Sequence, residues 1–215
     1  MAATVWLIAG PNGSGKSTIA ASPKFRRLLS TPEEAAPIWI NPDEMRRELA
    51  AFYPEKPTTE LDLLAARKAD DALEQAIEAQ VSVARETVLS TDRLIPTIER
   101  ALALNLRFGL VYVFLKDPEL NCERVQSRVE AGGHDVPRAK ILKRWAQSLE
   151  MLPLYAGYAH QVLIYDNSAI GKPRLLVEAT PTSVSVSAPP AYFDGVRPEV
   201  SKALSEVISI LASRP

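Results

Sequence analysis

Near the start of the chain, glycines alternate with small residues and lead to a lysine followed by two hydroxyl residues. The stretch follows the pattern G-x-x-x-x-G-K-[ST], with an apolar run before it and a helix-forming run after it. Glycines let consecutive backbone N–H groups point at one phosphate, and the start of a helix adds positive potential at the same place. This spacing predicts a nucleotide-binding loop made of Gly10, Pro11, Asn12, Gly13, Ser14, Gly15, Lys16, Ser17 and Thr18.

Two side chains of this loop have distinct expected roles. Lys16 is expected to bridge the β- and γ-phosphates of a nucleotide, and the Ser17 hydroxyl is expected to ligate Mg²⁺. The sequence therefore predicts ATP and Mg²⁺ as cofactors. The alternative is an ordinary glycine-rich turn between a strand and a helix. The two hydroxyl residues after the lysine and the flanking pattern disfavour that alternative.

Phosphate transfer to an alcohol also needs a carboxylate near the γ-phosphate, to orient and deprotonate the incoming hydroxyl. Ligands of open α/β sheets sit outside the carboxyl ends of the strands, where the chain offers Asp43, Glu86, Asp117 and Asp166. Asp117 is explained as a helix N-cap and Asp166 as a turn residue. Asp43 and Glu86 stay equally open as functional acids. The sequence shows no conventional Walker B strand, and Glu86 is the nearest substitute for its acid.

A segment rich in cations follows later in the chain, between residues 123 and 144. A Gly132-Gly133 break lets its two helices fold back as a hairpin, which over the phosphate loop would act as a lid spanning about residues 123–150. One arginine of the lid would stabilise charge during transfer. The alternative for each cation is a solvated surface position, and His134 in the connector either touches the nucleotide or hydrogen-bonds backbone. The cations are Arg124, Arg128, Arg138, Lys140, Lys143 and Arg144.

Alternating strand and helix patterns position these residues. Short apolar runs rich in β-formers predict strands, and apolar residues at 3-4 spacing predict the helices between them. The expected strands cover residues 4–9, 38–40, 81–85, 107–115 and 162–165, with 175–179 as a further edge strand. The expected helices cover residues 43–51, 59–80, 92–105 and 118–131, then one that opens at Pro137, and 198–213.

This alternation predicts an α/β P-loop NTPase fold. We expect three layers, α/β/α, around a mostly parallel sheet of five to six strands, with a helical lid. Residues 1–180 are expected to form the P-loop kinase domain. Residues 181–215 are expected to add a Pro/Ser-rich linker, over 181–195, and a C-terminal helix.

The amino-acid composition limits the kinds of partner and the cellular compartment that we expect. The 215-residue chain has 25 basic and 26 acidic residues, so it offers no global attraction to a membrane or to nucleic acid, and phosphorylation of nucleic-acid ends is disfavoured. A single cysteine, Cys122, excludes an internal disulfide and a cysteine-built metal site and suits a reducing compartment. No apolar run approaches the ~20 residues that span a bilayer, and the start lacks a basic signal region. A cytoplasmic protein is therefore expected.

Several stretches together resemble the zeta toxin family of P-loop kinases, specifically its compact bacterial branch. The most specific stretch is Gly132-Gly133-His134-Asp135-Val136-Pro137, at its distance after the phosphate loop. The resemblance spans roughly residues 4–170, and the matching stretches are 10–18, 41–46, 86–90, 124–137 and 165–168. It implies an ATP-dependent kinase acting on a small hydroxyl-bearing molecule. Better-understood members phosphorylate UDP-N-acetylglucosamine, often as toxins held by a partner antitoxin.

The resemblance also implies roles for individual side chains. The catalytic residues are then Asp43, Lys16, Arg128 and Arg144. Asp43 is the general base, and the two arginines contact the transferring phosphate. Ser17 serves the metal, while Glu86 lies at the acceptor or metal side. The acceptor is expected to contact Asp43, Arg46, Glu86 and Thr87.

A second hypothesis is a nucleotide-gated regulatory module without a metabolite acceptor. Such a module would bind and slowly hydrolyse ATP, and a partner protein would read the state of its lid. The expected helix at 198–213 is a candidate docking element for that partner. The two hypotheses differ in their products, because a kinase makes a phosphorylated metabolite and the module releases only inorganic phosphate.

Overall fold

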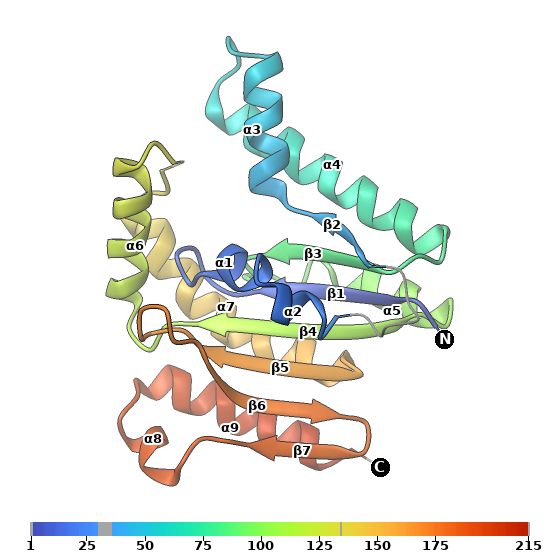
Figure 1. The fold of residues 1–215 in the computed structure, drawn as a ribbon, viewed down its shortest axis with the longest axis vertical. Coiled ribbons are helices and arrows are strands. Elements are labelled where there is room, and N and C mark those ends of the chain that lie inside the picture. Colours follow the sequence, from blue (N-terminus) through green and yellow to red (C-terminus); the bar gives the residue numbers. More distant parts are fainter. Residues whose placement is uncertain (1, 30–35, 134, 215) are drawn as a thin grey trace.

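The computed structural model describes residues 2–29, 36–133 and 135–214, so His134 lies outside the described part of the chain. Within these residues the strands form one seven-stranded sheet in the order β2-β3-β1-β4-β5-β6-β7 (Figure 1). The first five in this order are parallel, and β6 and β7 are antiparallel to their neighbours. The strands are β1 (Thr4–Ala9), β2 (Ile38–Ile40), β3 (Val83–Thr87), β4 (Arg107–Phe114), β5 (Gln161–Asp166), β6 (Arg174–Thr180) and β7 (Ser183–Val186).

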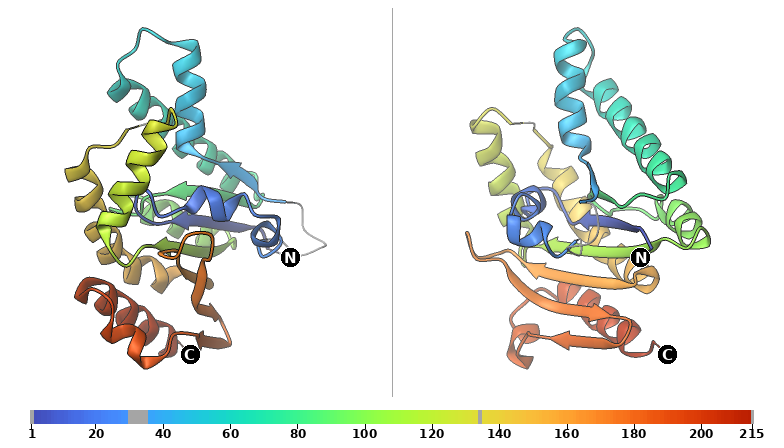
Figure 2. Two further views of the ribbon diagram at one scale, coloured as in Figure 1. Left: turned by 60° about the vertical axis from the view of Figure 1, so that its left-hand side comes forward. Right: turned by 45° about the vertical axis from the view of Figure 1, so that its right-hand side comes forward.

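Helices cover both faces of this sheet. They are α1 (Lys16–Ala20), α2 (Pro23–Arg26), α3 (Pro42–Phe52), α4 (Thr58–Glu78), α5 (Ile95–Ala103), α6 (Pro118–Glu130), α7 (Arg138–Tyr158), α8 (Pro190–Asp194) and α9 (Pro198–Ala212). Helices α1 and α2 lie on one face, and α4, α5, α7 and α9 lie on the other (Figures 1 and 2). The predicted three-layer α/β/α fold of a P-loop protein is confirmed. None of the described helices is both long enough and apolar enough to cross a membrane.

Strand β1 shows why the central strands read as continuous apolar runs. Val5 and Leu7 pack into the core beneath α4, α5 and α7, whereas Trp6 and Ile8 pack against α1 and α2. A parallel strand buried on both faces has no polar side, so its sequence does not alternate. The strand then ends at the phosphate loop, which places the loop at the carboxyl edge of the sheet.

Strand β3 lies two residues later than predicted, and the difference matters for the site. Gln80 takes a left-handed conformation with φ of 52°, and the Val81 N–H still bonds back to α4. The strand therefore begins at Val83 rather than at Val81. As a result Arg85 and Glu86 are both inside the sheet, where Glu86 pairs with Ile8 of β1.

The C-terminal segment differs most from the sequence-based expectation. The sheet has seven strands instead of five to six, because β7 and α8 occupy much of the stretch expected to be a linker. Strand β7 reads Ser-Val-Ser-Val and is exposed throughout, so no buried face marks it in the sequence. Strand β6 is consequently not the edge. The hydroxyl of Tyr192 in α8 donates to Asp166 Oδ2 at 2.8 Å, which ties the segment to β5. The expected C-terminal helix is α9.

Two helical pairs rise beyond the sheet and flank the phosphate loop. Helices α3 and α4 project past the β2 edge, and α6 stands at the same end of the sheet as α1 (Figures 1 and 2). Helix α6 ends at Glu130, Gly132 follows it with φ of 86°, and the chain returns as α7 to form the expected hairpin. The hairpin has a small core of its own, made of Cys122, Val125, Val136 and Ile141.

Candidate active site

The phosphate loop has the backbone conformation that its glycines were expected to permit. Gly13 and Gly15 have φ of 77° and 90°, in the left-handed region, and Gly15 is the N-cap of α1. A Cβ at Gly13 would lie 2.5 Å from the backbone oxygen of Asn121, and one at Gly15 would lie 2.3 Å from Asn167 Nδ2. Neighbouring elements therefore crowd the loop closely, and only glycine fits at these two positions.

The side chain of Lys16 folds back over the loop. Its Nζ donates to the carbonyl oxygens of Gly10 at 2.7 Å and Pro11 at 3.0 Å. Burial lowers the pKa of Lys16, and the carboxylates of Glu86 and Asp43 partly offset this effect. A bound phosphate would offer this ammonium charged acceptors in place of neutral carbonyls, and charge-assisted hydrogen bonds are the stronger kind.

Side chains from outside the loop hold it in shape. Asn121 of α6 donates to the backbone oxygen of Asn12 at 2.6 Å, and Asn167, just after β5, donates to that of Ser14 at 2.8 Å. Arg124 of α6 in turn donates to the backbone oxygen of Asn167 at 2.9 Å. Sequence reasoning gave the two buried asparagines no such role, because their partners are far away along the chain. The shape of the loop therefore depends on α6 and on the turn after β5.

The two acids left open by the sequence belong to one cluster. Glu86 accepts hydrogen bonds from Ser17 Oγ at 2.7 Å and from Asn41 Nδ2 at 3.0 Å. Asn41 is also the N-cap of α3, and its Oδ1 accepts from the backbone N–H groups of Asp43 at 2.9 Å and Glu44 at 3.4 Å. Glu86 is buried, whereas the side chain of Asp43 is 67% exposed. One asparagine therefore positions both acids, in different surroundings.

The oxygens of Ser17 and Glu86 suit a magnesium ion. Mg²⁺ prefers hard oxygen ligands, keeps several waters, and takes few ligands from the protein beside substrate phosphates. In the described ranges, no group of three or more His, Cys, Asp or Glu side chains is placed to hold a metal on its own. A hydroxyl and a carboxylate beside the phosphate loop fit an ion that arrives with a nucleotide.

Burial raises the pKa of Glu86, and the hydrogen bond from Ser17 and the charge of Lys16 offset part of the rise. The folded protein thus holds this proton more tightly than the unfolded chain does, so the charge of Glu86 costs stability as the pH rises. Glu86→Gln should raise the Tm of the metal-free protein at about pH 8, and the gain should shrink toward about pH 4. Scanning calorimetry of the wild-type protein and the variant in EDTA measures the difference in Tm at each pH. A gain independent of pH would contradict this cause.

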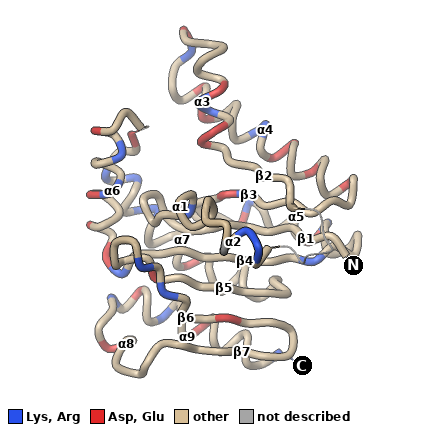
Figure 3. The backbone as a smooth tube through the Cα atoms, in the orientation of Figure 1, with Lys and Arg blue, Asp and Glu red and all other residues tan. Residues whose placement is uncertain are grey.

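Lid arginines approach the cluster from α6 and α7. Arg128 Nη1 lies 3.9 Å from Asp43 Oδ2, and Arg144 Nη1 lies 3.3 Å from Asn12 Oδ1. Figure 3 shows the basic residues of α6 at the end of the sheet where α1 begins. Arg138, by contrast, pairs with an acid of α6 at the surface. The hairpin therefore brings Arg128 and Arg144 close to the phosphate loop and the acid cluster. Arg138 instead lies at the solvated surface, which the sequence had left open as an alternative for each of these cations.

The remaining expected acceptor residues are placed nearby but are already engaged. Arg46 of α3 forms an ion pair of 2.7 Å with Asp62 of α4. The Oγ1 of Thr87 accepts from the backbone N–H of Leu89 at 3.2 Å and so shapes the turn after β3. Both Arg46 and Thr87 nevertheless line the same cavity as Asp43.

Two cavities meet at this cluster. A cavity of about 990 Å³ lies over the phosphate loop and extends past Phe25 and Tyr165. A second cavity of about 620 Å³ lies between the lid, α3, α4 and the loop after β3. The residues that line both are Asn12, Lys16, Asp43 and Glu86. Ligands in the two cavities would therefore meet at one amino group and two carboxyl groups.

Most of the predicted loop residues face the larger cavity. Its lining includes Asn12, Gly13, Gly15, Lys16, Ser17 and Thr18. Gly10, Pro11 and Ser14 are buried behind the loop, where they shape it. The sequence pattern therefore names the correct segment, but it does not separate the residues that face a ligand from those that support the loop.

Asn41 offers a test of the cluster. Asn41→Ala should cost about 1 kcal/mol of stability through the lost N-cap, and about ten-fold in any activity through misplacement of Glu86. Asn41→Ser is the matched control, because serine caps a helix but lacks the amide that donates to Glu86. Compared with Asn41→Ala, the Asn41→Ser variant should therefore regain thermal stability but not ATP turnover. Equal recovery of both would mean that Asn41 acts only as a cap.

Comparisons with known proteins agree with this geometry. A family model described as an AAA domain matches residues 5–152. A protein of Haemophilus influenzae described as uncharacterized is 30% identical over 136 residues, which cover 63% of this chain and 88% of the relative. The family match includes the phosphate loop, the acid cluster and the lid.

Two solved structures share the fold. The AvrRxo1-ORF1:-ORF2 complex with ATP has a TM-score of 0.65 at 16% identity, and the match covers 86% of this chain but only 61% of that one. The PezAT chromosomal toxin-antitoxin system of the human pathogen Streptococcus pneumoniae has a TM-score of 0.57 at 18% identity, with 99% and 86% covered. These identities show likeness of fold, and at that level the resemblance to zeta toxin kinases is confirmed. Because the family model matches well over half of the chain, the protein belongs to the AAA domain family of P-loop proteins.

Proposed function

We propose that this protein is an ATP-dependent kinase that transfers the γ-phosphate to a hydroxyl group of a small molecule. The observation that carries the proposal is the shared lining of the two cavities by Asn12, Lys16, Asp43 and Glu86. Transfer between two bound molecules requires such a junction, with the reacting atoms about 3–3.5 Å apart. A protein that only hydrolysed ATP would need the first cavity and not the second.

ATP suits the larger cavity. Its triphosphate would lie against the N–H groups of the loop and the Lys16 ammonium, and the apolar side chains of Phe25, Leu163 and Tyr165 offer a surface for the base. Mg²⁺, held by Ser17 and Glu86, would neutralise charge on the β- and γ-phosphate oxygens. This assigns the polar end of the cavity to the phosphates and the apolar end to the nucleoside.

In the transfer step, Asp43 accepts the proton of the acceptor hydroxyl. The hydroxyl oxygen of the acceptor then bonds to the γ-phosphorus of ATP as the bond between that phosphorus and ADP breaks. Asp43 suits this role because it is exposed and lines both cavities, whereas Glu86 is occupied by Ser17 and Asn41. The lysine and the two lid arginines stabilise the charge on the phosphoryl group. Closure of the lid excludes water and so limits wasteful hydrolysis.

The acceptor would occupy the smaller cavity, where Arg46 and Thr87 line the wall near Asp43. A sugar nucleotide such as UDP-N-acetylglucosamine is the candidate that the zeta toxin resemblance supports. Because one structural relative is a toxin-antitoxin system, we extend the proposal to an antitoxin-like partner protein. The acceptor and the partner are separate parts of the proposal, and either can be tested alone.

Incubation with γ-labelled ATP, Mg²⁺ and a bacterial metabolite extract tests the proposal. A kinase should produce one new labelled metabolite, and a parallel reaction with purified UDP-N-acetylglucosamine tests that candidate. Release of labelled inorganic phosphate alone would reject the kinase and support a nucleotide-gated regulatory module. Asp43→Asn serves as the control, because a true transfer product should disappear with it while nucleotide binding remains.

A further inference from the structure

A buried cation on β3 is outside the roles described above. Arg85 is 2% exposed and pairs in the sheet with Leu7 and Ile40. Its side chain leaves the opposite face of the strand from that of Glu86, and its Nη2 lies 2.6 Å from Asp70 Oδ1 of α4. The Nε and Nη1 atoms of Arg85 are buried and have no hydrogen-bond partner in the described part of the chain. Buried guanidinium N–H groups without acceptors are costly.

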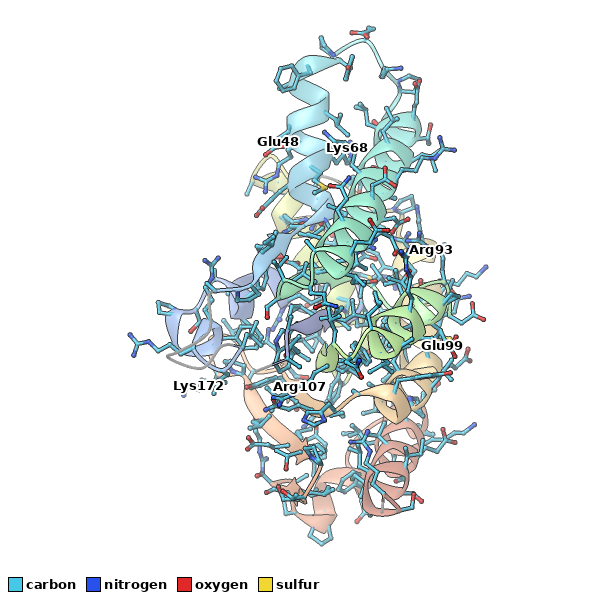
Figure 4. The ribbon with its side chains drawn as sticks, turned by 90° about the vertical axis from the view of Figure 1, so that its right-hand side faces the viewer. Glu48, Lys68, Arg93, Glu99, Arg107 and Lys172 are labelled. Atoms are coloured by element: carbon cyan, nitrogen blue, oxygen red, sulfur yellow. The ribbon has the colours of Figure 1, made fainter. Side chains whose placement is uncertain are left out.

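One carboxylate serves two guanidinium groups at this place. Asp70 forms ion pairs with both Arg85 and Arg93, and Arg93 lies in the turn just before α5. Figure 4 shows Arg93 at the level where α4 passes α5. Burial lowers the pKa of Arg85, and Asp70 compensates only in part. Two cations share one anion here, and because Arg85 is buried while Arg93 is half exposed, the excess positive charge lies at the boundary between the core and the surface.

The same two arginines line the smaller cavity. Arg85 and Arg93 contribute to its wall together with Leu94 and Tyr155, at the side where α4, α5 and α7 meet. The hydroxyl of Tyr155 is already used, because it donates to the backbone oxygen of Thr91 at 2.9 Å and accepts from the Leu94 N–H at 3.3 Å. The groups of this wall that could bind a ligand through charge are therefore Arg85 and Arg93.

The charges around the cavity as a whole agree with this local excess. Its lining cations are Lys16, Arg46, Arg85, Arg93, Lys140 and Arg144. Its lining acids are Asp43, Asp62, Glu86 and Asp135. Two of these acids lie at the junction with the nucleotide cavity, and Asp62 is paired with Arg46. An acceptor bound here would enter a cavity whose wall at Arg85 and Arg93 favours an anion.

We propose that Arg85 and Arg93 form an oxyanion subsite in the acceptor cavity. This rests on the proposed function, and it narrows the acceptor to a small alcohol that also carries a phosphate or carboxylate group. The oxyanion would accept hydrogen bonds from the guanidinium groups and would neutralise the charge that Asp70 leaves uncompensated. A neutral alcohol would leave that charge unpaired inside the cavity, so the site discriminates against it.

The subsite can be tested as a binding site, without turnover. The phosphate loop is first saturated with Mg²⁺ and a non-hydrolysable ATP analogue, so that added oxyanions cannot bind there. Inorganic phosphate and malonate are then titrated separately at low salt, followed by calorimetry. We expect the wild-type protein to bind at least one of the two, and the tighter one names the group that the acceptor carries.

Arg93→Ala is the informative variant, because Arg93 is at the surface and its loss should not disturb folding. Removing a charged donor should weaken binding of the oxyanion by about ten-fold or more. Arg100→Ala is the matched control, since Arg100 lies on α5, close to Arg93 in the chain, and pairs with Glu74 and Glu78 away from the cavity. Arg85→Lys, which keeps the buried charge but loses the planar fork, should also weaken binding.

Two results would overturn the subsite: neither oxyanion binds when the analogue is bound, or Arg93→Ala binds as the Arg100→Ala control does. Failure of the proposed function looks different. If the oxyanion binds as expected but γ-labelled ATP yields only inorganic phosphate with every extract, the subsite stands and the kinase proposal falls. If the label is transferred while no oxyanion binds, the kinase stands and the subsite falls.

Discussion

Asp43→Asn is expected to bind ATP as the wild-type protein does and to lose phosphoryl transfer by at least ~10²-fold, the usual scale for a general base. The asparagine keeps the shape of the side chain and cannot accept the proton of the acceptor hydroxyl. The backbone N–H of this residue, which Asn41 caps at 2.9 Å, is unchanged, so the start of α3 should remain in place. Calorimetric titration with the nucleotide and single-turnover transfer measure the two properties separately.

Glu44→Gln is the matched control for this prediction. Glu44 is the next residue in the first turn of α3, its backbone is held by the same cap, and its side chain, 55% exposed, lies near Arg47. The residues that line the two cavities do not include Glu44, so its substitution should leave transfer unchanged. Transfer at the wild-type rate by Asp43→Asn would remove Asp43 from the mechanism.

Lys16→Met is the second substitution with a large expected effect. It removes the cation that would stabilise charge on the transferring phosphoryl group, and we expect kcat to fall by roughly 10²–10³-fold. Stability should not fall with it, because burial lowers the pKa of Lys16 and methionine removes a desolvated charge. Turnover should thus fall, while the Tm of the nucleotide-free protein should not.

Lys68→Met controls for the loss of a lysine as such. Lys68 is exposed on α4, where Figure 4 labels it. Its substitution should change neither turnover nor unfolding. If Lys16→Met retained turnover, the loop would have to hold the phosphates by its backbone alone, and the assignment of Lys16 as a catalytic residue would be wrong.

The phosphate loop could be predicted from sequence because its requirements are local. The glycines, the lysine and the hydroxyl residue act within one turn, and the flanking strand and helix are adjacent in the chain. The caps of α3 and α6 are equally local. Asp117 accepts from the Glu119 N–H at 3.2 Å, as the N-cap pattern predicted, so it needs no catalytic role.

The rest of the site depends on register and on distant contacts, which no local pattern encodes. Glu86 is 69 residues away from the serine whose hydroxyl it accepts, and the contact exists only because β3 pairs with β1 in one register. Asn121 and Asn167 reach the loop across 109 and 153 residues. The sequence can therefore mark a polar residue at the end of a strand as a candidate site residue, but only the fold shows which groups it contacts.

The same limit explains the error in the C-terminal segment. Strand β7 pairs with β6 through its backbone, while its side chains stay exposed, so neither apolar alternation nor an apolar run marks it. The serines of β7 and the three prolines around it, Pro181, Pro189 and Pro190, are by contrast typical of a linker. Sheet edges of this kind are hard to predict because backbone pairing holds them, rather than the burial of side chains.

The most direct measurement is a crystal structure of the protein with Mg²⁺ and a non-hydrolysable ATP analogue. We expect the terminal phosphate within hydrogen-bonding distance of Lys16 Nζ, the base in the larger cavity, and the carboxylate of Asp43 facing that phosphate across the opening of the smaller cavity. A nucleotide bound away from the loop, or a terminal phosphate turned away from Asp43, would contradict this expectation.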